Sequence, residues 1–292
     1  MIERMTIFGV GLIGGSLALA LKKANFVGEI VGCSRDAQHL ERAVDLGVID
    51  RYVTDPRDAV RQSELVLLSV PVGAMQSVLE SIKDQLLPQT IVTDAGSSKA
   101  SVVAAAKNTF GAVPRRFVPA HPIAGRERSG VEAAIANLFV DHKVILCPLP
   151  QTDPEALATV QTMWEIAGAT VSQLDVEQHD QVLAATSHLP HVLAYSLVNT
   201  LVETEYVDEI FQYAAGGFRD FSRLASSDPT MWRDICLENR SAILSAIDQF
   251  QANLAGLKRQ IDHSDRDGIY QAFAHAKQTR DANVQKHSRR LS

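Results

Sequence analysis

A glycine-spaced turn near the start of the chain constrains its fold more than any other stretch. The apolar run Met5–Phe8 leads into Gly9, Gly11 and Gly14, and an apolar segment follows over residues 17–21. This order predicts a strand, a tight turn and a helix, the arrangement that holds the pyrophosphate of a dinucleotide. The helix offers unpaired backbone N–H groups and its positive dipole end to the phosphates. The alternative is a glycine-rich turn in another kind of α/β protein.

The residues of this loop have separate expected tasks. Gly9 permits the turn out of the strand, Gly11 lets the backbone approach the pyrophosphate, and Gly14 lets the helix pack closely on the strand. Leu12 and Ile13 complete the loop. We therefore expect all five residues to contact a nucleotide.

Composition narrows the class of protein. The chain has 292 residues, 46% hydrophobic and 21% charged, which suits one large or two modest domains. Its net charge of −6 disfavours a nucleic-acid partner. Cys33, Cys147 and Cys236 lie far apart, which favours a reducing compartment over a disulfide framework. No apolar run has the length of a membrane span, and a strand is predicted almost at Met1, so we expect no signal peptide, no membrane contact and a cytoplasmic location.

Short apolar runs alternate with helical patterns through the first half of the chain. This alternation predicts an α/β domain over residues 1–174, with a Rossmann-type doubly wound parallel sheet that binds ligands at the carboxyl ends of its strands. Helical spacing is found, for example, over Ala37–Leu46, Val72–Ile82 and about Pro154–Ala167. The candidate strands are Thr6–Phe8, Ile30–Cys33, Leu65–Ser69, Ile91–Thr93, Phe117–Ala120, Val144–Cys147 and Thr170–Leu174.

The second half of the chain, residues 175–292, reads as helical throughout. Glycine becomes rare there, except at 216–217, and this change in composition sets the predicted domain boundary. An apolar stripe that includes Leu254, Leu257 and Ile261 has no sheet to cover it. We expect these helices to pack against a partner subunit, as an all-α substrate-binding and dimerisation domain.

The tip of the second predicted strand bears on the choice of cofactor. Ser34 and Arg35 follow this strand and suit the 2′-phosphate of NADP, since arginine pairs well with phosphate. Asp36 lies one or two residues later than the acid that binds the ribose hydroxyls of NAD. NADP is favoured and NAD is the alternative; Arg35 as a plain surface charge is the other interpretation.

Two further stretches lie at predicted strand ends. Pro71 cannot continue a central ladder, so the chain leaves the sheet there, and we expect backbone contacts from Val70 and Pro71 to the cofactor. After the fourth strand, Ser97 is placed next to the nicotinamide and the substrate. A helix N-cap at Ser97 or Ser98 is the other interpretation, and both can hold together.

His121 follows an apolar strand and is held by Pro122, so it is expected to point into the crevice. Histidine is readily tuned to take up a proton near neutral pH. A histidine with a purely structural role is the alternative. The polar loop that follows, Arg126–Gly130, is expected to close over an anion.

A long helix predicted over about Val176–Val202 carries His188 and His191 on one face, because they are three residues apart. Pro190 is expected to kink this helix. No Cys/His cluster supplies the further ligands of a metal site, so no metal is predicted. Histidines that pack between helices are the alternative.

A polar cluster follows the two glycines of the second half. Here Asp220 and Arg223 are three residues apart, and Arg223 is a candidate for bidentate binding of a substrate carboxylate. A helix start with surface ion pairs is the alternative. The next helix is predicted to begin with Asp228 as its N-cap and Pro229 in its first turn.

Taken together, these motifs resemble the prephenate/arogenate dehydrogenases of tyrosine biosynthesis over nearly the whole chain. The resemblance rests on five ordered motifs: Gly9–Ser16, Asp94–Lys99, His121–Gly125, Ser187–His191 and Gly217–Arg223. It implies an NAD(P)-dependent oxidative decarboxylation of a cyclohexadienyl substrate, to 4-hydroxyphenylpyruvate or tyrosine. It also implies a homodimer with intertwined helical domains and active sites between the two domains.

The resemblance also implies roles for particular residues. The catalytic histidine corresponds to His121, which hydrogen-bonds the C4 hydroxyl of the ring. Ser97 corresponds to a serine that touches this hydroxyl and the nicotinamide, and Arg223 to the arginine that binds the carboxylate. The pocket-lining residues of the family correspond to His191 and His188.

Four other positions are linked to the substrate by the same resemblance. Glu127 corresponds to an acid near the substrate side chain, and Trp232 to a dimer-contact residue close to the site. Asp220, within the Gly217–Arg223 motif, and Gly216, just before it, are further candidates for substrate binding. Arg126 departs from the small residue that family members often carry, which leaves the choice between prephenate and arogenate open.

Two rival functions remain at this point. One is another NADP-linked dehydrogenase with a helical dimer domain; such enzymes rely on a lysine or aspartate where this chain has His188 and His191. The other is a nicotinamide-sensing protein without catalysis. Such a protein needs no polar pocket, and this chain offers the polar set Ser97, His121, His191 and Arg223.

Overall fold

A computed structural model describes residues 1–126 and 128–288. The chain divides between Ala242 and Ile243 into two compact units. The first unit contains both β-sheets and every residue that the sequence singles out for chemistry, and the described residues of the second form two helices and the turn between them.

A six-stranded sheet forms the centre of the first unit. Its order, β3-β2-β1-β4-β5-β6, with all neighbours parallel, is that of a doubly wound dinucleotide-binding sheet, so the Rossmann prediction is confirmed. The strand β3 was not predicted, because three residues are too few to show a period. The strands are β1 (Ile2–Phe8), β2 (Val27–Cys33), β3 (Arg51–Val53), β4 (Leu65–Leu68), β5 (Ile91–Asp94) and β6 (Phe117–Val118).

The central strand β4 shows why both faces of this sheet are covered. Leu65 and Leu67 point to one hydrophobic cluster, whereas Val66 and Leu68 point to the other, and all four are fully buried. Successive side chains of a strand face opposite sides, so a run of four apolar residues needs two covering layers.

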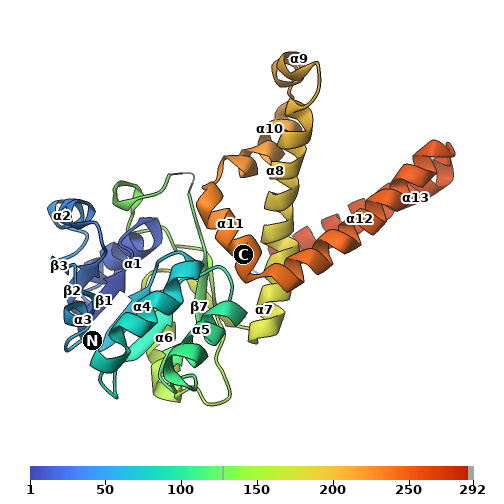
Figure 1. Cartoon of the computed structure of the whole chain (residues 1–292). Helices are drawn as coiled ribbons and strands as arrows, with labels where there is room; N and C mark the ends of the chain where they lie inside the picture. The colour runs from blue at the N-terminus through green and yellow to red at the C-terminus, as the bar shows by residue number, and fades with distance from the viewer. Residues whose placement is uncertain (127, 289–292) are drawn as a thin grey trace. The chain divides into compact units, whose positions relative to one another are not determined.

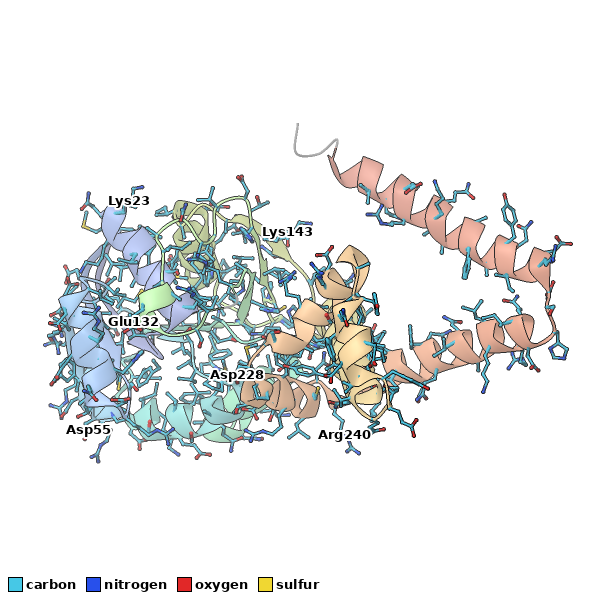
Figure 2. The ribbon with its side chains drawn as sticks, turned by 90° about the horizontal axis from the view of Figure 1, so that it is seen from above. Lys23, Asp55, Glu132, Lys143, Asp228 and Arg240 are labelled. Atoms are coloured by element: carbon cyan, nitrogen blue, oxygen red, sulfur yellow. The ribbon has the colours of Figure 1, made fainter. Side chains whose placement is uncertain are left out.

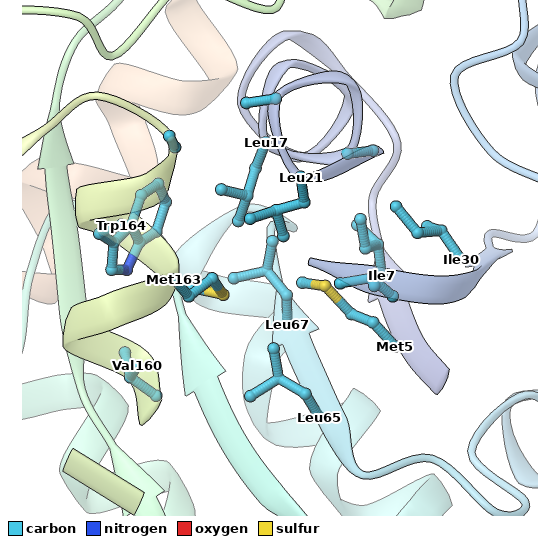
Figure 3. Packing of buried hydrophobic residues seen from close by; sticks show 14 of the residues in the cluster. Met5, Ile7, Leu17, Leu21, Ile30, Leu65, Leu67, Val160, Met163 and Trp164 are labelled. Carbon is cyan, nitrogen blue, oxygen red and sulfur yellow. The ribbon is translucent and has the colours of Figure 1, made fainter. Parts of the chain in front are cut away.

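Helices supply these two layers. On the first face, Leu17 and Leu21 of one helix meet Met163 and Trp164 of another over the strands (Figure 3). Two helices that lie side by side, cyan and green in Figure 1, cover the second face. The helices of this region are α1 (Leu12–Lys23, whose end is labelled in Figure 2), α2 (Ala37–Asp45), α3 (Pro56–Ala59), α4 (Met75–Ile82), α5 (Ala100–Phe110) and α6 (Pro154–Ile166).

A second, three-stranded sheet consists of β7 (Ala120–Ile123), β8 (Lys143–Leu146) and β9 (Thr170–Gln173). The pair β7–β8 is antiparallel and β8–β9 is parallel. The expectation that all these strands belong to one parallel sheet was wrong. The predicted strand 117–120 is divided at Pro119, which has no N–H to extend the ladder of β6.

The helix predicted over residues 176–202 is present, with an irregular turn just before the proline. It consists of α7 (Val176–Leu183), a π-helical turn (Ala184–His188) and α8 (Leu189–Val202). Pro190 lies in the first turn of α8 and has no N–H to donate. The wider turn lies just upstream, so the irregularity falls on the segment that ends at His188.

The rest of the first unit is built from short helices, and α11 begins as predicted, with the Asp228 carboxylate accepting from the Met231 N–H at 2.7 Å. Asp228 is labelled in Figure 2. These helices are α9 (Val207–Gln212), α10 (Gly216–Ser222), a 3₁₀ turn (Arg223–Ser226) and α11 (Pro229–Glu238).

The second unit consists of two long helices. The helix α12 (Arg240–Asp262) starts in the last residues of the first unit, and α13 (Arg266–Ser288) follows a short turn. Side chains stand out along both helices (Figure 2), and apolar ones among them, Ile261, Tyr270 and Phe273, are more than half exposed. Among the described helices, none combines the length and apolar character that crossing a membrane requires.

Candidate active site

The glycine loop lies at the carboxyl end of β1, where the helix α1 begins. Gly9 has a φ of +86°, and a Cβ there would fall on the backbone of Ser69. A Cβ on Gly14 would lie 2.5 Å from the carbonyl oxygen of Gly9 and 2.9 Å from Ile7 Cγ2. Both positions therefore exclude a side chain, as the turn and the close helix packing require.

Gly11 differs from these two glycines because a Cβ there meets nothing within 4 Å. It is the N-cap of α1, and no side chain caps this helix end. The unpaired N–H groups of the first turn, which includes Leu12 and Ile13, are thus left to an anion. Gly9 packs against the segment that leads to Val70 and Pro71, which brings that segment to the same edge. The loop fits a dinucleotide pyrophosphate.

The tip of β2 holds the residues expected to select the cofactor. Asp36 is the N-cap of α2, and its carboxylate accepts from the His39 N–H at 3.1 Å. Ser34 Oγ accepts from the Asp36 N–H at 3.3 Å, and Arg35 is exposed. The carboxylate of Asp36 is therefore engaged in capping.

A buried ion pair ties the end of β5 to the start of β7. Lys99 and Asp94 are both fully buried, and Lys99 Nζ donates to the Asp94 carboxylate and, at 2.7 Å, to the Ala120 carbonyl. Asp94 in turn accepts from the Ala120 N–H at 3.0 Å. These contacts bring the loop that carries Ser97 to the strand that carries His121.

The predicted capping of α5 by Ser97 or Ser98 was wrong. Lys99 occupies the N-cap position without a side-chain cap. The carboxylate of Asp180, on α7, accepts from the N–H of Lys99 at 2.8 Å and of Ala100 at 2.9 Å. A carboxylate offers two acceptor oxygens, so one side chain from a distant helix satisfies both donors.

His121 lies inside β7, not at a strand end as expected, and is 8% exposed. Its Nδ1 is 2.9 Å from Nε2 of His179. Burial, the charge of Lys99 and the neighbouring His179 and His188 hold the pKa of His121 well below its usual range. The ring is therefore neutral at pH 7.

The other two predicted histidines meet around one indole ring. His188 is edge-on to Trp232, and His191 stacks on it, so the expected shared face is confirmed. Asn239 Nδ2 donates to His188 Nδ1 at 3.1 Å. Burial lowers the pKa of His188 to about 4, against a smaller opposing effect of the Asp180 carboxylate.

Arg223 begins the turn that follows α10 and is exposed. Burial lowers the pKa of His191, the hydrogen bond to the Ser187 carbonyl raises it, and the charge of Arg223 lowers it. The side chains of Arg223 and His191 are therefore neighbours. The Tyr195 hydroxyl of α8 donates to the Ser227 carbonyl at 2.6 Å and holds this turn against α8.

Of the other predicted substrate residues, three are exposed and one lies outside the described residues. Gly216 and Asp220 are exposed positions of α10. Arg126 is exposed, and its Nη1 donates to the Ala133 carbonyl at 3.5 Å. Glu127 lies outside the described residues.

Sequence reasoning missed His179, Asp180, Lys99 and Asn239 as members of the site. The available signal was the adjacent pair His179–Asp180, two polar residues that are buried on α7. Nothing in the sequence marks Asn239, whose Nδ2 also donates to the Asp180 carbonyl at 2.9 Å. Within the described part of the chain, no group of His, Cys, Asp and Glu side chains is arranged to hold a metal ion.

The uncapped helix α1 follows β1, and the buried imidazole of His121 lies in β7, which Lys99 ties to the end of β5. Fold and site together define a dinucleotide-dependent dehydrogenase. Comparison with known proteins narrows this class. Family models described as "prephenate dehydrogenase, nucleotide-binding domain" and "prephenate dehydrogenase, dimerization domain" match residues 17–173 and 175–275.

Individual proteins agree with these models. The chain is 39% identical to a cyclohexadienyl dehydrogenase of Zymomonas mobilis over 95% of each chain. It is 34% identical to a prephenate dehydrogenase of Bacillus subtilis, over 96% of this chain and 76% of the relative. The chain belongs to the prephenate dehydrogenase family, whose members are oxidoreductases that use NAD(P).

Solved structures show the same relationship. A crystal structure of prephenate dehydrogenase from Aquifex aeolicus in complex with hydroxyphenyl propionate and NAD+ superposes with a TM-score of 0.89 at 38% identity, covering 96% of this chain and 98% of that one. An arogenate dehydrogenase from Synechocystis gives a TM-score of 0.81 at 27% identity, covering 96% and 99%.

Proposed function

We propose that this protein oxidises and decarboxylates prephenate, arogenate or both, with NADP as the favoured cofactor and His121 as the proton acceptor. The observation that carries the proposal is a buried, neutral imidazole on β7, tied through Lys99 to the loop of Ser97. Names of relatives at 34–39% identity support the same substrate class.

The glycine loop fits the cofactor that this reaction needs. The open space at Gly11 and the uncapped start of α1 would hold the pyrophosphate. Val70 and Pro71 would contact it from the neighbouring strand end. When bound, NAD(P)+ supplies the oxidant that takes the hydride from C4 of the ring.

The task of His121 follows from its charge state. As C4 becomes a carbonyl carbon, its hydroxyl loses a proton, and a neutral imidazole has a lone pair to accept it. Such general base catalysis is worth roughly 10²–10⁴-fold in rate. Ser97, on the adjoining loop, would orient the hydroxyl.

Arg223 would bind the substrate carboxylate. Its guanidinium matches the two oxygens of a carboxylate, and it neighbours His191, which stacks on Trp232. The carboxyl group at C1 leaves as carbon dioxide because the ring gains aromaticity. The residues need only orient the substrate and take up the hydroxyl proton.

The preference for NADP rests on the tip of β2. The Asp36 carboxylate is engaged as a helix cap, whereas Ser34 and the exposed Arg35 are available to a 2′-phosphate. We expect Arg35→Ala to raise KM for NADP+ strongly and KM for NAD+ little. Equal effects on both cofactors would remove Arg35 from this role.

We further propose that the protein is a homodimer through its helical part, with the domain boundary near residue 174. Exposed apolar side chains along α12 and α13 need a covering surface, and the dimerization model spans residues 175–275. Sedimentation at micromolar concentration tests this point, and a monomer would contradict it.

The main experiment compares initial rates of cofactor reduction for both substrates with both cofactors. Turnover of prephenate or arogenate supports the proposal. Reduction only with another hydroxy acid would favour a different NADP-linked dehydrogenase, and cofactor binding without any turnover would favour a sensor.

Two variants assign the roles. We expect His121→Asn to bind substrate but lose most of kcat, and Arg223→Ala to raise KM strongly. Arg219→Ala, which removes an exposed arginine of the preceding helix α10, is the matched control. Near-normal turnover of His121→Asn, or an unchanged KM of Arg223→Ala, would remove that residue from the mechanism.

A further inference from the structure

Behind His121 lies a chain of two side chains that the proposed reaction does not itself require. Nδ1 of His121 is 2.9 Å from Nε2 of His179, and Nδ1 of His179 is 2.8 Å from Oδ1 of Asp180. His179 is fully buried, and Asp180 is 5% exposed. The three groups form one hydrogen-bonded line from a carboxylate to the candidate base.

The carboxylate at the end of this line is ionised. Burial raises the pKa of Asp180, but hydrogen bonds from the His179 ring and from the N–H groups of Lys99 and Ala100 outweigh it and hold this pKa below its usual range. The two N–H groups belong to the start of α5, whose dipole also favours a negative charge. Asp180 therefore only accepts hydrogen bonds.

Because the Asp180 carboxylate only accepts, it determines which nitrogen carries the hydrogen in the rings of His179 and His121. Nδ1 of His179 must carry a hydrogen to donate to Asp180, and a ring with this single hydrogen has only a lone pair at Nε2. Nδ1 of His121 must then donate to it. Since His121 is neutral at pH 7, its Nε2 carries the lone pair, and this nitrogen makes no hydrogen bond to any described residue.

We propose that His179 and Asp180 are a positioning pair that fixes the tautomer of His121, so that Nε2 of His121 meets the substrate hydroxyl as an acceptor. The pair touches neither substrate nor cofactor in this role. The idea rests on His121 being the proton acceptor of the proposed function. With the opposite tautomer, Nε2 would present a hydrogen to the hydroxyl and could not take up its proton.

The charges around His121 explain why a carboxylate is placed there. Lys99 lies in the loop before α5, and its charge disfavours a positive ring. Asp94 of β5 pairs with Lys99. Asp180 is the anion at the other end of the line, and it stabilises the imidazolium that forms when His121 takes up the proton.

The tautomer is measured directly, and independently of turnover. In protein labelled with ¹⁵N-histidine, long-range ¹H–¹⁵N correlation separates rings protonated at Nδ1 from rings protonated at Nε2, and the spectrum of His121→Asn identifies the His121 signals. We expect the Nδ1-protonated form at pH 7. The Nε2-protonated form would overturn the proposal, even if the enzyme oxidises prephenate.

Substitution of Asp180 tests the cause. In Asp180→Asn, the amide can donate to His179 Nδ1 and so reverse both rings. We expect the Nε2-protonated form of His121, a fall in kcat of roughly 10²–10⁴-fold and little change in KM. Asp175→Asn removes a charge at the start of the same helix and retains a capping side chain, so its kcat and spectrum should match those of the wild type. An unchanged tautomer or kcat in folded Asp180→Asn overturns the proposal.

Substitution of His179 separates orientation from packing. His179→Gln retains an acceptor oxygen that Nδ1 of His121 can use, whereas His179→Leu has none. We expect the Gln variant to keep at least tenfold more kcat than the Leu variant, at similar KM and similar melting temperature. Equal kcat for the two folded variants would show a structural role and contradict the proposal. Absence of prephenate and arogenate turnover in the wild type would instead refute the proposed function, and the spectra would still report the tautomer.

Discussion

The imidazole of His191 lies almost flat on the indole of Trp232, with ring centroids 3.7 Å apart and planes 17° from parallel. His191 Nδ1 donates to the Ser187 carbonyl at 2.9 Å, so the ring is held at its edge and on its face. Trp232 is buried by residues of its own chain. This stack fixes the position of the His191 ring, which neighbours Arg223.

Replacement of Trp232 should therefore impair substrate binding through His191. We expect Trp232→Ala to raise KM for the cyclohexadienyl substrate roughly two- to tenfold, since an aromatic pair is worth about 0.5–1.5 kcal/mol. Trp232→Phe retains a ring and should lie nearer the wild type. Initial rates over a range of substrate concentrations give both constants.

The control for this prediction is Met231→Ala, an exposed neighbour on the same helix, which should leave KM unchanged. A thermal melt must show that Trp232→Ala is folded at the assay temperature. Folded Trp232→Ala with the KM of the wild type would mean that the stack does not shape the pocket.

Gly11 and Gly14 of the loop allow a paired test that separates folding from cofactor binding. Gly14→Ala places a Cβ 2.5 Å from the Gly9 carbonyl oxygen, a backbone atom that cannot move aside, so we expect lower stability. Gly11→Ala meets no protein atom within 4 Å and should fold normally, while its methyl group occupies the space of the pyrophosphate. Urea denaturation and cofactor titration separate the two effects.

Gly11→Ala thus serves as the control for Gly14→Ala. The interpretation of the loop would be wrong if Gly11→Ala bound the cofactor with unchanged affinity, or if Gly14→Ala were as stable as the wild type.

Much of the fold could be predicted from the sequence because the information is local. The glycine loop, the apolar strands and the N-cap at Asp228 each depend on residues within one turn or one strand. Pro119 shows the limit: its missing N–H ends the ladder of β6, but the residues that pair with β7 in antiparallel register lie 20 to 26 positions away in the sequence.

The site could be predicted only as far as single residues with distinctive chemistry. His121, His188, His191 and Arg223 stand out by type. The tasks of Asp180 could not be derived, because its carboxylate caps a helix that starts 80 residues earlier and bonds the ring of its own neighbour. Such roles depend on which elements pack together.

The buried His188 should make stability depend on pH. In the unfolded chain this side chain takes up a proton near pH 6.5, but in the folded protein it does so only near pH 4. Above pH 6.5 both states are neutral and nothing is lost. Between these values the unfolded state binds more protons, so the free energy of unfolding falls as the pH is lowered, by about 3 kcal/mol in full.

Urea denaturation at pH 7 and pH 5 measures this effect. His188→Gln cannot take up a proton and should show a smaller loss between the two pH values than the wild type. His142→Gln, which removes an exposed histidine, should retain the loss of the wild type. Equal pH dependence of His188→Gln and the wild type would contradict the assignment.

Breaking the ion pair of Lys99 and Asp94 should lower the free energy of unfolding far more than breaking a surface pair, because both partners are fully buried. Lys99→Met leaves the Asp94 carboxylate buried without its cation, which costs about 3–5 kcal/mol. Lys22→Met breaks an exposed pair with Asp50 and should cost about 1 kcal/mol or less.

A double variant separates the charge from the packing. Asp94→Asn in the Lys99→Met background removes the unpaired charge, while its amide oxygen can still accept from the Ala120 N–H. We expect the double variant to be more stable than Lys99→Met in urea denaturation. If Lys99→Met were no less stable than Lys22→Met, the buried pair would not be what holds the loop of Ser97 to the strand of His121.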